Sequence, residues 1–140
     1  MSEEILKVEN LKTYFFTASG VAKAVDGVSY TLKKGEILGI VGESGSGKSV
    51  SASSVIRLLP KTGRVVDGTI LFEGKDMRKI SDKELRKIRG NEISVIFQDP
   101  MTSLDPVFKV GSQMVELIRT HNNVSKEEAR KIAVKNLELV

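Results

Sequence analysis

The sequence predicts an α/β fold built around one glycine-rich loop, and three observations predict it. The loop, at residues 42–49, follows a short apolar run and precedes a segment of helical period. Short strand-like segments separated by turn residues come before it, and segments with helix-capping signals come later. A buried strand that passes through a loop into a helix is typical of α/β proteins, so the three features favour this class.

Composition agrees with a globular domain, because 40% of the 140 residues are hydrophobic and 29% are charged. No apolar run has the length of a membrane span, and the first four residues are acidic where a signal peptide would be basic. We therefore expect the chain in the cytosol. Cysteine is absent, which excludes disulfides and thiolate zinc sites, and the single His121 cannot form a metal site alone.

The net charge of +4 does not predict a nucleic-acid partner. The densest basic segment, residues 75–89, is diluted by acidic residues, and no aromatic residues interleave with its charges. This pattern favours a solvated helix face over a nucleic-acid patch.

Antiparallel strands are expected before the loop, at residues 5–16, 21–25 and 28–32. Asp26-Gly27 predicts a turn between the last two, and a second turn is expected at residues 33–35. The apolar run 37–41 then predicts a strand buried on both faces.

The loop itself fits the pattern G-x-x-x-x-G-K-[ST] at every fixed position, which predicts a P-loop. Its glycines allow positive φ and close approach of successive N–H groups to phosphate oxygens. A helix beginning at about Gly47 adds unpaired amides and its positive dipole end. Lys48 supplies a charge at the β- and γ-phosphates, and Ser49 Oγ a ligand for Mg²⁺. The expected nucleotide-binding residues of the loop are Gly42, Ser44, Gly45, Ser46, Gly47, Lys48, Ser49 and Val50. A linker that matches by chance is disfavoured by the flanking elements.

The segment after the loop predicts a helix that Pro60 stops. An Asp67-Gly68 turn is expected to open a strand at residues 69–72, which Gly74 closes as an edge hairpin. A capping box at residues 81–84 predicts a short helix with Leu85 and Ile88 inward and Gly90 as its stop.

Residues 93–97 predict another buried strand, which ends at Gln98-Asp99-Pro100. As a Walker B strand it fits poorly, because Gln98 stands where the first acid should be. Two further helices are expected, one from Val110 onward and one after a second capping box at residues 125–128.

With the P-loop, Gln98 and the stretch 97–107 (Phe-Gln-Asp-Pro-Met-Thr-Ser-Leu-Asp-Pro-Val), the sequence resembles the ATPase subunit of ABC transporters. The stretch is similar to the di- and oligopeptide importer subfamily. The resemblance implies an ABC-type P-loop NTPase core with an N-terminal antiparallel β-subdomain in residues 1–98. It also implies the exit from the Q-loop and the start of a helical subdomain in residues 99–140.

The resemblance also implies roles for single residues. Gln98 matches the Q-loop glutamine, which touches Mg²⁺ or the attacking water, so Lys48 and Gln98 are the implied catalytic residues. Ser49 and Gln98 are the implied metal ligands. Phe15 aligns with the aromatic residue that stacks on adenine, although packing of Phe15 in the core remains an alternative.

Three family elements have no counterpart in these residues: a Ser-Gly-Gly-Gln-type signature, a Walker B run ending in Asp-Glu, and a switch histidine. In the family they lie downstream, so the chain is expected to be an N-terminal fragment that binds nucleotide without turnover. The strands that the family places between its two buried strands would also be missing. Open strand edges predict self-association, rearranged packing or disorder around Gln98.

The function implied is the ATP-binding portion of an ABC importer ATPase for di- or oligopeptides, with ATP and Mg²⁺ as its ligands. Its expected partners are transmembrane permease subunits and a second ATPase subunit, which would hold it at the inner face of the membrane. Two alternatives stay open: a different P-loop NTPase, such as a kinase or GTPase, and a non-catalytic module that binds nucleotide or a partner.

Overall fold

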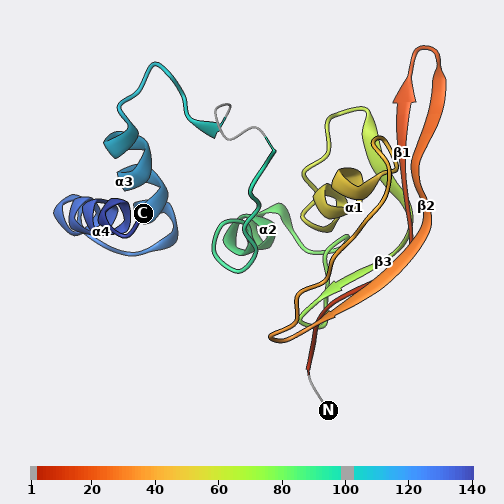
Figure 1. Cartoon of the computed structure of the whole chain (residues 1–140), viewed down its shortest axis with the longest axis horizontal. Helices are drawn as coiled ribbons and strands as arrows, with labels where there is room; N and C mark the ends of the chain where they lie inside the picture. Colours follow the sequence, from red (N-terminus) through yellow and green to blue (C-terminus); the bar gives the residue numbers. More distant parts are fainter. Residues whose placement is uncertain (1–2, 99–102) are drawn as a thin grey trace. The chain divides into compact units, whose positions relative to one another are not determined.

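The computed structural model describes residues 3–98 and 103–140 and divides the chain after Leu85 into two compact units. The first holds a four-stranded sheet and one helix, the second holds a pair of helices, and a further short helix at residues 82–88 crosses the division (Figure 1). In chain order the elements are β1 (Glu4–Thr17), β2 (Gly20–Lys33), α1 (Lys48–Val55), β3 (Gly63–Phe72), β4 (Lys75–Asp76), α2 (Asp82–Ile88), α3 (Val110–His121) and α4 (Lys126–Glu138).

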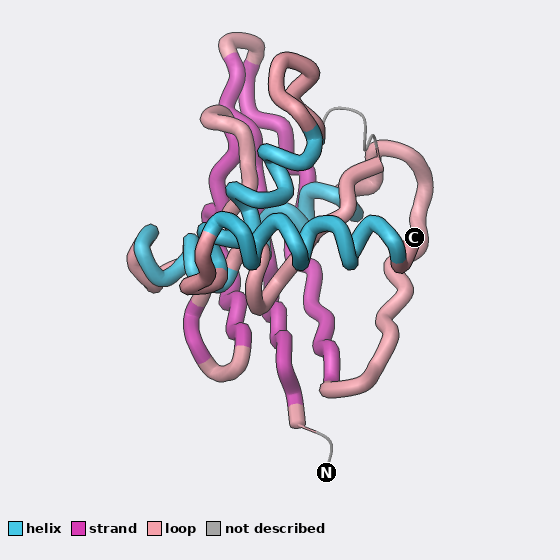
Figure 2. Tube along the Cα trace, turned by 90° about the vertical axis from the view of Figure 1, so that its left-hand side faces the viewer, coloured by secondary structure: helices cyan, strands magenta, loops and turns pink. Residues whose placement is uncertain are grey.

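The sheet of the first unit is antiparallel throughout, with the strand order β2-β1-β3-β4. Strand β1 is an inner strand that pairs with β2 along one edge and with β3 along the other. In Figure 2 the strands, in magenta, lie side by side. The tight turn between β3 and β4 confirms the predicted edge hairpin at Gly74. The predicted antiparallel β-rich start of the chain is therefore confirmed.

Two predicted turns are wrong, because Gly27 and Gly68 lie inside continuous strands. Each has a positive φ, 88° at Gly27 and 94° at Gly68, and the strand register shifts beside each of them. These are the features of β-bulges, in which an extra residue is accommodated while the ladder continues on both sides. Glycine takes the left-handed conformation without steric cost, so the same residue type serves a bulge or a turn.

Helix α1 packs on one face of the sheet, against β1 and β2, and the core of this unit lies at that contact. Apolar side chains from the strands and the helix are buried there, among them Val8, Leu11, Val25, Val55 and Ile56. Three buried residues are polar: Thr13, Ser51 and Ser54. Two of the three come from α1, so its sheet-facing side is not wholly apolar.

The end of α1 differs from the prediction that Pro60 stops the helix. The helix ends at Val55, and Arg57 takes a positive φ of 54°. The N–H of Leu58 then donates to the carbonyl of Ser53 at 2.8 Å, the 6→1 bond of a Schellman-type ending. A local backbone hydrogen bond, rather than the proline, therefore terminates the helix.

The two strands predicted to be buried on both faces, 37–41 and 93–97, are not strands in the structure. Ile37 is 97% exposed, Val41 96% and Ile96 94%. A central strand needs a neighbour on each edge for its backbone groups. In the described part of the chain nothing pairs with 37–41, and Ile93 forms only an isolated bridge with Arg89.

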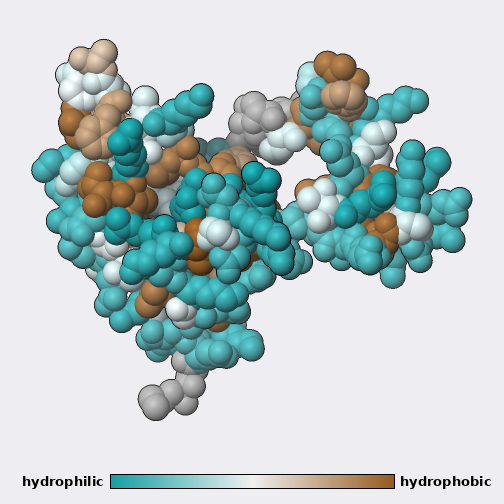
Figure 3. Space-filling model, turned by 180° about the vertical axis from the view of Figure 1, so that it is seen from behind, coloured by the Kyte–Doolittle hydropathy of each residue, from teal (hydrophilic) through white to brown (hydrophobic). Residues whose placement is uncertain are grey.

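These segments carry part of the exposed apolar surface of the chain. Figure 3 shows apolar side chains, in brown, among hydrophilic ones on one face of the molecule. The self-association expected from open strand edges stays a prediction.

Helices α2 and α4 begin as predicted. Ser81 and Glu84 exchange the hydrogen bonds of a capping box before α2, where Leu85 and Ile88 are buried. Gly90, with a φ of 79°, follows the end of that helix. Ser125 and Glu128 form the second capping box, before α4.

The apolar faces of the C-terminal helices are less buried than their periodicity predicts. Helix α3 packs against α4, where Ala129 and Ala133 are buried. Ile132 and Leu137, predicted on the same side, are 38% and 52% exposed, and no residue of α3 is fully buried. None of the helices described is both long enough and apolar enough to cross a membrane.

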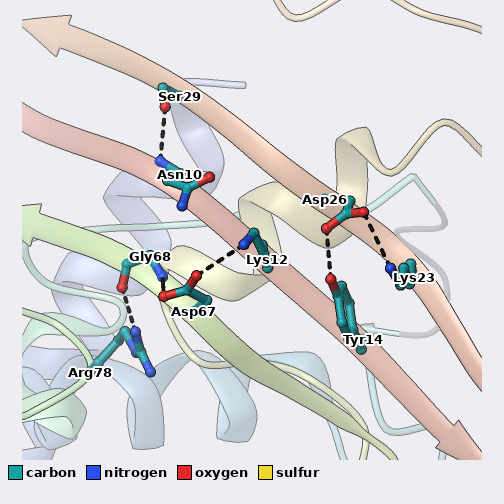
Figure 4. A network of polar contacts seen from close by, with 9 residues as sticks. All are labelled: Asn10, Lys12, Tyr14, Lys23, Asp26, Ser29, Asp67, Gly68 and Arg78. Atoms are coloured by element: carbon teal, nitrogen blue, oxygen red, sulfur yellow. Dashed lines mark hydrogen bonds and ion pairs between the residues drawn. The ribbon is translucent and has the colours of Figure 1, made fainter.

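The sheet face opposite α1 carries a network of polar contacts (Figure 4). By strand alternation Lys12 and Tyr14 lie on the face opposite to Thr13, which contacts α1. The Tyr14 hydroxyl donates to Asp26 at 2.6 Å, and Lys12 pairs with Asp67 at 3.0 Å. These side chains tie β2 and β3 to the central strand.

Candidate site: a phosphate-binding loop at the start of helix α1

The predicted P-loop leads directly into α1, which begins at Lys48. Gly47 is the N-cap residue, with φ 90° and ψ 2°, and Gly45 also has a positive φ of 79°. No side chain caps the helix, and its first turn holds no acidic residue. The positive end of the helix dipole is therefore left without a negative partner, which suits an anion.

Backbone amides of the loop are available to a ligand. The N–H groups of Ser44, Gly45 and Gly47 donate no hydrogen bond within the described residues, whereas the N–H of Ser46 donates to the carbonyl of Glu43 at 3.2 Å. The residues from Gly42 to Ser46 are exposed. An anion at this place could therefore accept hydrogen bonds from several amides at once.

Lys48 closes the loop. Its ammonium group donates to the carbonyl oxygens of Gly42 and Glu43, each at 2.7 Å, and lies 3.4 Å from Ser46 Oγ. Three contacts match the three protons of an ammonium group. The charge is thus held at the mouth of the loop rather than extended into solvent.

Close packing requires a glycine at position 47, because a Cβ there would lie 2.2 Å from the carbonyl oxygen of Ala24 in β2. A Cβ at Gly42 would lie 2.7 Å from Ser46 Oγ, the end of a side chain that can rotate away. A Cβ at Gly45 would meet nothing within 4 Å, so this glycine serves conformation alone. The loop is therefore packed against the strand β2 through Gly47.

Hydroxyl groups join α1 to the sheet beneath the loop. Thr13 Oγ1 of β1 lies 2.8 Å from Ser54 Oγ, and the Tyr30 hydroxyl of β2 lies 3.0 Å from Ser51 Oγ. Burial raises the pKa of Tyr30, and the hydrogen bond with Ser51 opposes that shift. These four residues were not among the predicted site residues. Their signal is a pair of serines, three residues apart, which lie with Val55 on the buried side of α1.

Ser49 and Val50, also predicted in the site, lie in the first turn of α1. Ser49 is exposed, so its hydroxyl is accessible to a cation, and a hydroxyl oxygen is a donor that Mg²⁺ accepts. Val50 is half-buried and accepts a hydrogen bond from Ser54 Oγ through its carbonyl. No group of three or more metal-ligating His, Cys, Asp or Glu side chains occurs among the described residues.

Phe15 lies near the end of β1, opposite Gly63 of β3. It is half-buried, and its ring fills the space that a Cβ at Gly63 would occupy, 2.8 Å from its Cε1. Its neighbours face other groups. Tyr14 lies beneath the ammonium group of Lys23 at 5.5 Å, and Phe16 beneath the guanidinium group of Arg64 at 5.7 Å.

Gln98 is exposed and belongs to the second unit, whereas the P-loop and Phe15 belong to the first. The structure thus brings together the loop residues within the first unit. The remainder of the predicted Q-loop exit, Asp99 to Thr102, lies outside the described residues.

Known proteins are similar to this chain in both sequence and fold. A family profile described as "ABC transporter" matches residues 25–139. The probable peptide ABC transporter ATP-binding protein y4tR of Sinorhizobium fredii is 48% identical over 137 residues, which cover 97% of this chain and 41% of that protein. The oligopeptide transport ATP-binding protein OppD of Bacillus subtilis is 51% identical over 137 residues, which cover 97% of this chain and 38% of the relative. The chain therefore spans well under half the length of these relatives.

A solved structure titled as the dimeric structure of MJ0796, a bacterial ABC transporter cassette, superposes with a TM-score of 0.80 at 26% identity. The match covers 95% of this chain and 56% of the cassette. A second structure, of a post-hydrolysis state of the same cassette bound to ADP and Pi, gives a TM-score of 0.77 at 24% identity. These likenesses confirm the predicted ABC-type ATPase fold. With the family profile matching most of its residues, the chain belongs to the ABC transporter family.

Proposed function

We propose that this chain is the ATP-binding portion of an ABC importer ATPase that couples ATP hydrolysis to the uptake of dipeptides or oligopeptides. The observation that carries the proposal is the P-loop, where the Lys48 ammonium is held beside free amides at an uncapped helix N-terminus. The names of the relatives support the peptide substrate, since they include oligopeptide and dipeptide transport proteins.

Binding would proceed by exchange of hydrogen bonds. Phosphate oxygens accept from the amides of Ser44, Gly45 and Gly47, which make no bond within the described chain. Lys48 trades part of its contact with the carbonyls of Gly42 and Glu43 for a charge-assisted bond to phosphate. The ammonium group already lies at the loop, so the exchange needs little movement of its side chain.

Magnesium would accompany the nucleotide. Ser49 Oγ is an exposed oxygen donor in the first helical turn, and the amide oxygen of Gln98 is a second donor of the same hard type. Mg²⁺ keeps several waters and phosphate oxygens as ligands, so one or two protein donors are enough. When bound, the ion supplies positive charge to the phosphate oxygens.

Phe15 would provide the surface for adenine. Stacking of a base on an aromatic ring contributes about 1–3 kcal/mol. One side of the Phe15 ring is in contact with Gly63, which fixes its orientation while the residue remains partly accessible. Core packing of the ring and stacking on adenine are therefore compatible.

The partners follow from the family. A second copy of the ATPase subunit and transmembrane permease subunits would hold the chain at the cytoplasmic face of the membrane. The dimeric cassette among the structural relatives supports the pairing of two ATPase subunits. The 140-residue polypeptide by itself is expected to bind ATP without turnover, because its sequence holds no Asp-Glu-terminated Walker B strand and no Ser-Gly-Gly-Gln signature.

Calorimetric titration with MgATP tests the proposal. We expect saturable binding that Lys48→Ala removes, while Lys83→Ala, at an exposed lysine of α2, leaves the affinity unchanged. A preference for GTP over ATP would contradict the assignment and favour a different P-loop NTPase. Phosphate release from the 140-residue polypeptide that depends on Lys48 would contradict the absence of turnover.

A further inference from the structure

A chain of buried hydroxyl groups joins the central strand to the first turn of α1. Thr13 and Ser54 are both 0% exposed, and their oxygens lie 2.8 Å apart. Ser54 Oγ donates its single proton to the carbonyl oxygen of Val50 at 2.6 Å. Thr13 Oγ1 is therefore the donor to Ser54 Oγ, so the two hydrogen bonds are donated in one direction, from Thr13 to Ser54 and from Ser54 to the carbonyl of Val50.

A second link lies one turn nearer the loop. Ser51 Oγ contacts the Tyr30 hydroxyl at 3.0 Å, and the backbone N–H of Ser51 donates to the carbonyl of Gly47 at 2.8 Å. Gly47 itself packs on the backbone of Ala24. The start of α1 is thus attached to both β1 and β2 by polar or close backbone contacts.

Helix formation alone does not explain these serines. Serine is a mediocre helix former, because its hydroxyl competes for backbone groups. A buried hydroxyl without a partner costs about 1–3 kcal/mol, so apolar residues would be the simpler choice at positions facing a core. What a hydroxyl adds is direction, because its hydrogen bond fixes the rotation of the helix and its position along its axis, whereas apolar contacts tolerate sliding.

The strand that carries this anchor also carries the aromatic residue of the site. Thr13 and Phe15 are two residues apart on β1 and so lie on the same face of the strand. The anchor at Thr13 therefore fixes the distance between Phe15 and the loop that α1 carries.

We propose that Thr13 and Ser54 are positioning residues for the nucleotide, which set the spacing between the phosphate loop and the aromatic ring of Phe15. This inference rests on the proposed binding of ATP. It predicts that the pair affects the affinity for ligands that contact both the loop and the Phe15 ring. The affinity for ligands that occupy the loop alone should hardly change.

Two ligands separate these cases: MgATP, which spans loop and ring, and inorganic tripolyphosphate with Mg²⁺, which occupies the loop only. We expect Thr13→Val and Ser54→Ala each to raise the Kd for MgATP about fivefold to tenfold, because binding must then order the loop and ring at a cost close to the contribution of the lost hydrogen bond. In the same two variants the Kd for tripolyphosphate should change less than about twofold. Thr13→Ser, which keeps the hydroxyl, should restore ATP binding.

Ser53→Ala is the matched control, since Ser53 is a serine of the same helix whose side chain makes no hydrogen bond in the described chain. It should leave both Kd values unchanged. The double variant Thr13→Val/Ser54→Ala should cost less than the sum of the single changes, because two groups that act through one bond are not additive. Circular dichroism on each variant establishes that it is folded.

An unchanged Kd for MgATP in the folded single variants overturns the inference and leaves the proposed function intact. An equal loss for ATP and tripolyphosphate also overturns it, because it indicates a general loosening of the loop. If the unmutated chain binds neither ligand, the proposed function fails and the positioning role fails with it.

Discussion

The ammonium group of Lys48 lies 2.7 Å from the carbonyl oxygen of Gly42, six residues earlier in the chain. A residue of the first helical turn thereby holds the beginning of the loop that leads into the helix. The same ammonium also bonds the carbonyl of Glu43. Lys48 therefore has a structural effect on the loop as well as its proposed role at the phosphates.

Lys48→Met should loosen the loop even when no nucleotide is present. The change keeps an unbranched side chain of nearly the same length and removes the charge and all three donors. We expect faster amide hydrogen exchange at residues 42–46, measured by mass spectrometry, with little change in β1 and β3. Lys83→Met serves as the control, and equal exchange at residues 42–46 in both variants would show that the lysine contacts do not order the loop.

Gly47 and Gly45 should respond differently to alanine. Both have a positive φ, which costs an L-residue about 1–2 kcal/mol. Only Gly47 also meets a neighbour, the Ala24 carbonyl at 2.2 Å from an added Cβ. We expect Gly45→Ala to lower the free energy of unfolding by about 1–2 kcal/mol and Gly47→Ala by roughly 3 kcal/mol or more, measured by urea denaturation.

This pair separates backbone strain from packing, since each variant serves as the control for the other. Equal destabilisation would mean that β2 moves away from Gly47 at no cost. The contact between the loop and the bulged strand would then be looser than its distances indicate.

Local signals in the sequence predicted local structure well. The capping boxes at Ser81 and Ser125 form as expected, because each depends on residues within four positions of one another. The P-loop pattern likewise predicted a loop that leads into a helix beginning at about Gly47, and the structure confirms this with a helix that begins at Lys48. The roles of its residues in binding stay predictions.

The errors arise where a distant part of the chain decides the local structure. Whether Gly27 lies in a turn or in a bulge depends on pairing with β1, and the residue type is the same in both cases. Apolar runs such as 37–41 predict burial, but burial needs a partner strand that the described residues do not provide. The hydroxyl contact between Thr13 and Ser54 spans 41 positions, so the serines of α1 indicate a polar contact but the local sequence does not identify Thr13 as the partner.

Tyr14→Phe should raise the pKa of Asp26. The hydrogen bond from the Tyr14 hydroxyl is the main cause that holds the pKa of Asp26 below its ordinary value of 3.8, with the Lys23 and Lys12 charges adding to it. Without that bond the pKa should move back toward the ordinary value, as measured by NMR titration of the carboxyl carbon. Asp67, whose pKa is lowered mainly by its hydrogen bond with Lys12, is the internal control and should not move.

The contact between Tyr14 and Asp26 should weaken both in acid and in strong base. The pKa of Asp26 is lowered in the folded chain, so the contact stabilises at neutral pH and is lost as the pH falls through that lowered pKa. The pKa of Tyr14 is raised, mainly by the same hydrogen bond, so the contact is also lost as the pH rises through the raised pKa, above 10.0. An unchanged Asp26 titration in Tyr14→Phe would show that the hydroxyl does not bond the carboxylate in solution.

Ser125→Ala should fray the start of α4. The Ser125 hydroxyl accepts from the Glu128 N–H at 3.2 Å and donates to the Glu128 carboxylate at 2.7 Å. Loss of such an N-cap costs about 1 kcal/mol, which should appear as faster hydrogen exchange at the Glu128 amide.

The pKa of Glu128 is lowered mainly by the hydrogen bond of its carboxylate with the Ser125 hydroxyl. The hydrogen bond of the carboxylate with the Ser125 backbone N–H is the second cause. The stabilisation is therefore present at neutral pH and is lost as the pH falls through the lowered pKa. The difference in exchange between Ser125→Ala and the unmutated chain should accordingly shrink in acid. Ser112→Ala, at an exposed serine of α3 whose hydroxyl makes no hydrogen bond among the described residues, should exchange like the unmutated chain at Glu128. A difference that persists undiminished below the pKa of Glu128 would show that the carboxylate takes no part in the cap.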